Sequence, residues 1–61
     1  MPPYDLEVVE HLMENNTLPE LRCLLLNQGV CEKLSKESSI PPHILRASAV
    51  EAIRRLEEGA I

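Results

Sequence analysis

One pattern in this sequence repeats at an interval of 22 residues and constrains the fold more than any other feature. The mix of apolar and charged residues at 8–12 returns at 30–34 and again at 52–56. The polar, proline-bearing turn at 16–19 also returns, at 38–41. Each unit therefore reads as the end of one helix, a short turn and the start of the next helix, which is typical of repeated helical chains.

Start signals divide the chain into helices. Thr17 followed by Glu20 is a capping-box pattern, and Pro19 lies in the first turn, where its missing N–H costs nothing. Ser39 before Pro41 repeats this signal without the acidic partner. The apolar residues are almost all aliphatic, with neither Phe nor Trp, which suits helix packing. We predict an all-α, three-helix antiparallel hairpin or bundle that forms a single domain over 1–61, with helices near 3–15, 18–37 and 41–58.

The stretch Asn27-Gln28-Gly29 leaves a second division open. Gly29 equally well ends a short helix and lets a fourth helix begin at Val30. We favour one long helix with a kink at Gly29, because an interior glycine costs only about 1 kcal/mol relative to alanine.

Helical projection gives the first and last predicted helices one apolar arc each. The first arc consists of Leu6, Val8, Val9, Leu12 and Met13. The second arc consists of Leu45, Ala49, Ala52, Ile53 and Leu56, with Glu51, Arg54, Arg55 and Glu58 opposite. Each helix is expected to bury one side.

The middle helix differs, because it has two apolar stripes on nearly opposite sides. One consists of Leu18, Leu21 and Leu25, and the other of Cys23, Leu26, Val30 and Leu34. A helix that is apolar almost all round must be covered on both sides. We therefore expect a homodimer or larger homo-oligomer, completed through the stripe of Cys23, Leu26, Val30 and Leu34.

Charge is unevenly distributed along the chain. Residues 1–20 carry five acidic side chains and no Lys or Arg, and the net charge is −4. This balance disfavours binding to nucleic acid or to an anionic membrane. Since no apolar run approaches 18 residues and no signal-peptide pattern is present, we expect a soluble protein of the cytoplasm with no membrane partner.

The His, Cys and carboxylate side chains lack the arrangement that a metal site, a disulfide or an active site requires. His11, Cys23, Cys31 and His43 do not form metal-ligand pairs, and the two cysteines, about 12 Å apart on one helix, are too distant for a disulfide. The carboxylates lie on helix surfaces without a glycine-rich loop or a cleft. We therefore predict no catalytic residue, no metal and no cofactor, and a chain that is not an enzyme.

These exclusions favour a protein–protein interaction or regulatory adaptor module. Its partner-facing residues are predicted on the acidic side of the first helix and the arginine-bearing side of the last. They are Glu7, Glu10, Glu14, His43, Arg46, Arg54 and Arg55. In a second interpretation, the three arginines only solubilise an outer face and pair with Glu51 and Glu58 at helical spacing.

Two resemblances bear on the fold. Ser39-Ile40-Pro41-Pro42-His43-Ile44-Leu45-Arg46-Ala47-Ser48 resembles the Thr-Val-Pro-x-Asn-Ile-Arg-Arg-Ala-Ala type of motif that opens helices in a family of small, uncharacterised archaeal proteins with HEAT-like hairpins. That resemblance implies paired antiparallel helices and no established activity.

The stretch 34–42, followed by a helix and the ending Arg54-Arg55-Leu56-Glu57-Glu58-Gly59-Ala60-Ile61, is similar to winged-helix DNA-binding domains. This resemblance implies the alternative function of a small helix-turn-helix DNA-binding regulator. Its base-facing residues are then expected to be His43, Arg46 and Ser48.

Overall fold

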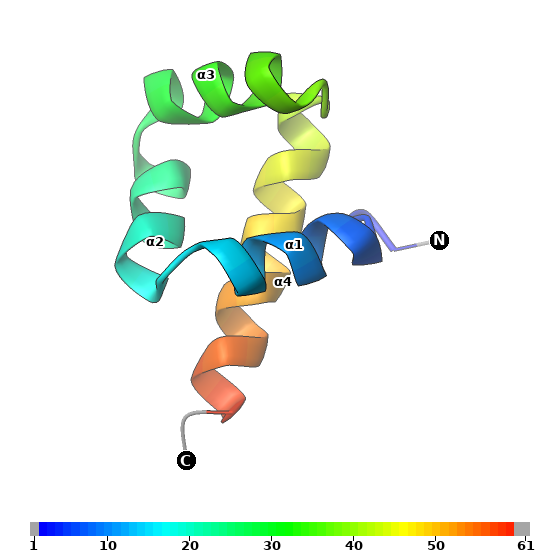
Figure 1. The fold of residues 1–61 in the computed structure, drawn as a ribbon, viewed down its shortest axis with the longest axis vertical. Coiled ribbons are helices and arrows are strands. Elements are labelled where there is room, and N and C mark those ends of the chain that lie inside the picture. Colours follow the sequence, from blue (N-terminus) through cyan, green and yellow to red (C-terminus); the bar gives the residue numbers. More distant parts are fainter. Residues whose placement is uncertain (1, 60–61) are drawn as a thin grey trace.

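The computed structural model describes residues 2–59, and within this range the chain forms four helices and no strand (Figure 1). The helices are α1 (Leu6–Asn15), α2 (Leu18–Leu26), α3 (Gln28–Ser38) and α4 (Pro42–Gly59). The all-α prediction is confirmed, whereas the division into three helices is wrong. The predicted domain of 1–61 also includes residues 1, 60 and 61, which lie outside the described residues.

Helix α4 is the centre of the fold, because it packs against each of the other three helices. In Figure 1, α1 crosses in front of α4, while α2 and α3 meet at a corner beside it. The core is aliphatic apart from one thiol, and it consists of Val9, Leu12, Leu21, Leu24, Cys31, Leu45, Ala49 and Ala52. Each helix therefore contributes to a single buried cluster.

Helix α1 begins three residues later than the predicted start at residue 3. Asp5 has extended backbone angles, and its side chain accepts a hydrogen bond of 2.9 Å from the amide of Glu7. This N-cap satisfies an amide that has no partner inside the helix. Pro2 and Pro3 therefore precede the helix rather than opening it.

The turn between α1 and α2 agrees with the sequence signals. The Thr17 side chain accepts from the Glu20 amide at 3.4 Å, and the Glu20 carboxylate accepts from the Thr17 amide at 2.8 Å. The predicted capping box is thus present, with Pro19 in the first turn of α2. The capping box and Pro19 together define where α2 begins, and the chain takes a new direction there.

The predicted long helix over 18–37 is broken at Asn27. This residue ends α2, where its amide bonds to the Cys23 carbonyl, and it also starts α3, where its side chain accepts from the amides of Gly29 and Val30. Gly29 therefore lies in the first turn of α3 and does not kink a continuous helix. The Asn27 N-cap satisfies two amides at the start of α3 and so favours a new helix at this point.

The sequence predicts that Ser39 caps the start of the last helix, but the turn between α3 and α4 is built differently. Ser39 is the C-cap of α3 and has a left-handed backbone, with φ of 59°. The Ser35 hydroxyl donates to the Ile40 carbonyl, and the Pro41 carbonyl accepts from Ile44 and Leu45 at the start of α4. The chain therefore reverses at Ser39, and the double proline follows the turn.

Two predicted faces need correction. The sequence places Leu6 on the buried arc of the first helix, but this residue begins α1 and is 50% exposed. Glu51 was assigned to the outer side of the last helix, but only 9% of it is exposed. Helix α4 packs against three other helices, and its buried residues include Ser48 and Glu51, so its buried arc is wider than one face.

Candidate interaction surface

An apolar groove of about 300 Å³ lies between α2 and α3. We call it the α2–α3 groove and define it by the residues that line it. They are Asn16, Glu20, Cys23, Leu24, Val30, Lys33, Leu34 and Glu37. The groove arises because one flank of α2 and one flank of α3 face each other across the corner at Asn27.

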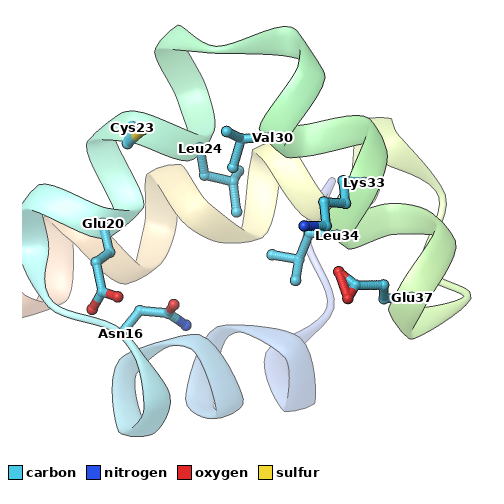
Figure 2. Close-up of a pocket in the computed structure, with 8 residues that line it drawn as sticks. All are labelled: Asn16, Glu20, Cys23, Leu24, Val30, Lys33, Leu34 and Glu37. Carbon is cyan, nitrogen blue, oxygen red and sulfur yellow. The ribbon is translucent and has the colours of Figure 1, made fainter.

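The groove has an apolar centre and charged ends. Figure 2 shows Leu24, Val30 and Leu34 pointing into the space that α1, α2 and α3 border, with Glu20 near one end and Glu37 near the other. Lys33 lies on the α3 side close to Glu37 in the sequence. A side chain that enters the groove therefore contacts aliphatic carbon at the centre and has charges of both signs around it at the rim.

Glu20 is fixed at its end of the groove by the capping box. The backbone amide of Thr17 is the main cause that lowers the pKa of Glu20, and the Thr17 hydroxyl adds to this effect. The carboxylate is therefore ionised over the physiological range and held in one orientation. It supplies a fixed negative charge beside the apolar centre.

Three of the four predicted oligomer-interface residues line this groove, and the fourth lies beside it. Cys23, Val30 and Leu34 come together even though the helix that was expected to carry them is broken. Leu26 lies outside the groove at the end of α2 and is 88% exposed. Leu24, which belongs to neither predicted stripe, forms part of the groove and also of the core.

The predicted acidic surface of α1 faces water. Glu7, Glu10 and Glu14 are exposed, and none of the three forms an ion pair within residues 2–59. His11 lies on the same exposed side, where its backbone carbonyl accepts a hydrogen bond of 2.8 Å from the Asn15 side chain. The surface is acidic, but none of these three glutamates lines the α2–α3 groove.

Two of the predicted partner-facing arginines are engaged within α4. Arg54 bonds to Glu51 and to Glu58 at 2.7 Å each, and Arg55 bonds to Glu51 at 2.7 Å. The Arg54 and Arg55 guanidinium groups lower the pKa of Glu51 from 4.5 to about 2. Glu51 in turn raises the pKa of both arginines. The interpretation of these residues as an intrahelical ion-pair network is confirmed for Arg54 and Arg55.

The surface proposed for DNA binding is only partly available. His43 and Arg46 are exposed on α4. Ser48 is fully buried, and its hydroxyl accepts a hydrogen bond of 3.2 Å from the Asp5 amide. The assignment of Ser48 as a base-facing residue is therefore wrong, because α1 covers it.

A second cleft, of about 410 Å³, lies between the N-terminal segment and the turn before α4. Its lining is mainly apolar and includes Tyr4, Val8, Ile40 and Ile44. The acidic residue in this lining is Asp5, whose carboxylate caps α1. Apart from Asp5, the polar side-chain group in this lining is the Tyr4 hydroxyl.

The described residues contain no cluster of three His, Cys, Asp or Glu side chains that would hold a metal ion. Cys23 is an exposed free thiol and Cys31 a buried one. Over residues 2–59, every helix is too short or too polar to cross a lipid bilayer.

No known protein family, characterised protein or solved structure matches this chain. Its class is defined by its own fold and surface, which are those of a small all-α domain with an apolar groove between two helices.

Proposed function

We propose that this chain is a non-enzymatic protein-interaction or regulatory adaptor module, and that the α2–α3 groove is its binding surface. The observation that carries the proposal is the groove itself, in which aliphatic side chains line an open space on a domain with a small core. Aliphatic surface left open to water is a common mark of a binding site.

The groove has the composition of an interaction surface. Its centre is aliphatic, and its charges lie at the ends, where Glu20 and Glu37 remain in contact with solvent. Protein interfaces commonly combine an apolar centre that excludes water with a polar rim that sets orientation. Such an arrangement accepts a protruding apolar side chain from another polypeptide.

The perturbed titratable groups support a non-enzymatic role. Active sites often hold groups whose pKa is shifted for catalysis. In this chain the shifts have structural causes, since the cap at Thr17 accounts for Glu20 and the paired arginines account for Glu51. Neither shift favours an acid or base that exchanges protons near neutral pH.

Site-specific photo-crosslinking in living cells tests the proposal. A photoreactive amino acid is placed at Val30, which lines the groove and is 37% exposed, and in a matched control at Val50, which is 55% exposed on α4 and lies outside the groove. We expect a discrete crosslinked polypeptide from position 30 and none from position 50. Equal, diffuse crosslinking from both positions contradicts the proposal.

A further inference from the structure

Leu26 is the most exposed of the large aliphatic side chains in the described part of the chain, at 88%. It is the last residue of α2, immediately before the cap at Asn27. Cys23, which precedes it by one helical turn, lines the groove. A protruding leucine and an apolar groove are therefore neighbours on one surface.

We propose that the occupant of the α2–α3 groove is a second copy of this chain, which inserts its Leu26 while its own groove receives Leu26 of the first copy. This inference rests on the proposed function, because it names the partner of the same groove. In a two-fold dimer each patch must contain both the protruding group and the site that accepts it. Leu26 and the groove meet that condition side by side.

The size of the groove suits the insertion. Its volume is about 300 Å³, whereas an apolar cavity of about 150 Å³ is enough to hold benzene. The side chain of one leucine fits, and the aliphatic residues Leu24, Val30 and Leu34 offer it a matching surface. The exposed thiol of Cys23 lies where the second copy would cover it.

The charges at the rim are compatible with self-association. Lys33 lies in the same lining as Glu20 and Glu37. A two-fold axis allows the lysine of each copy to face a glutamate of the other, whereas a rim of one sign would repel its copy. The acidic side of α1 gives no such complementarity, since residues 1–20 contain no Lys or Arg.

The area that a stable dimer must bury also favours an interface that includes Leu26 as well as the groove. A stable interface covers about 800 Å² on each partner, and the exposed surface of this chain is 4293 Å². About a fifth of the surface must then be covered, which is more than the groove alone provides. Leu26, one helical turn after the groove residue Cys23, supplies apolar surface next to the groove.

Sedimentation or light scattering over a dilution series tests the proposal, with four chains compared. They are the wild type, Leu26→Glu, the conservative Leu26→Met and the control Val50→Glu. We expect wild type, Leu26→Met and Val50→Glu to reach twice the chain mass of 6.9 kDa. Leu26→Glu is expected to associate at least about 100-fold more weakly, because a two-fold interface loses the leucine twice.

Alkylation of Cys23 gives an independent measurement on the same chains. Cys23 should react slowly in the dimer and faster on dilution or in Leu26→Glu, while buried Cys31 should react only on unfolding. Because Leu26 faces water, its replacement is not expected to unfold the chain, and circular dichroism verifies this. Protection of Cys23 that follows the dimer mass supports the insertion of Leu26.

Failure of this inference is distinguishable from failure of the proposed function. A chain that stays monomeric overturns the second copy as occupant, and a dimer that Leu26→Glu leaves intact overturns the insertion of Leu26. If position 30 then crosslinks to a different protein, the groove is still an interaction surface. If position 30 crosslinks to no polypeptide, the proposed function fails as well.

Discussion

Replacing Asn27 by alanine tests the feature that gives the molecule its corner. The Asn27 side-chain oxygen accepts from the amide of Gly29 at 3.0 Å and from the amide of Val30 at 3.3 Å. Alanine leaves both amides without this partner, and loss of such an N-cap typically costs about 1 kcal/mol, in the range of 0.5–2. We expect the free energy of unfolding to fall by that amount.

This loss is large for so small a chain. At roughly 0.05–0.15 kcal/mol per residue, 61 residues imply a stability of about 3–9 kcal/mol. A change of about 1 kcal/mol lowers the Tm of a domain of this size by about 4–8 °C. The effect is therefore well within the resolution of a thermal melt.

Alanine also favours a continuous helix, so two outcomes compete. If α2 and α3 merged into one rod, α3 would leave α4, and the buried Cys31 and the half-buried Leu34 would lose their contacts with the core. Burial of one leucine-sized side chain is worth roughly 1.5–3 kcal/mol, which exceeds the value of the cap. We therefore predict that the corner persists and that the variant is simply less stable.

Urea and thermal unfolding followed by far-UV circular dichroism measure the loss, and amide hydrogen exchange at Gly29 and Val30 locates it. Asn27→Asp is the matched control, since its carboxylate retains the acceptor and should keep most of the stability. An unchanged Tm in Asn27→Ala, or a gain of helix with slower exchange at Gly29, would refute the reasoning.

Three other perturbations have defined outcomes. The Arg54 and Arg55 guanidinium groups hold the pKa of Glu51 below its ordinary value, so the ionised carboxylate stabilises the folded chain above pH 4.5. This contribution is lost as the pH falls toward 2. The Tm measured across that window should therefore fall less in Glu51→Gln than in the wild type. Leu21 is fully buried, so Leu21→Ala should cost about 2–5 kcal/mol in urea unfolding, and a cost under 1 kcal/mol would contradict the core assignment. With a net charge of −4 and Ser48 buried, we expect no duplex DNA binding at low salt in a fluorescence anisotropy titration, and binding that weakens in Arg46→Ala would instead favour the helix-turn-helix alternative.

Local signals in the sequence were sufficient where a helix end depends on neighbouring residues. The capping box of Thr17 and Glu20 was predicted from two side chains three residues apart, and the structure contains it. The buried positions Val9 and Leu12 also follow from helical periodicity, because α1 has one covered side. Such features require no knowledge of the rest of the fold.

Features that depend on tertiary packing were not predictable from periodicity. Glu51 is only 9% exposed on a helix that packs against three others, and the sequence does not state how many neighbours a helix has. Leu6, the first residue of α1, is 50% exposed although periodicity places it on the buried arc. The available signal for Glu51 was its spacing to Arg54 and Arg55, which predicts an ion pair but not burial.

The break at Asn27 was missed because the local signals for it are weak. The asparagine N-cap is worth only about 1 kcal/mol, and Gly29 lies inside a helix whether or not the chain breaks at Asn27, so its cost does not decide between the two. Periodicity alone cannot separate such alternatives. Packing of Cys31 and Ser35 against the rest of the fold, which only the structure provides, favours the corner.

The same break explains why an apolar stripe becomes a groove. On one continuous helix, Val30 would lie six residues after Leu24 and, at about 100° per residue, would face about 120° away from it. The stripe of Cys23, Val30 and Leu34 would then be convex and would suit a partner helix lying along it. With the chain turned at Asn27, Leu24 and Val30 line one concave space instead. A concave surface suits a single inserted side chain, which favours the Leu26 insertion that we propose over the helix–helix seam expected from the sequence.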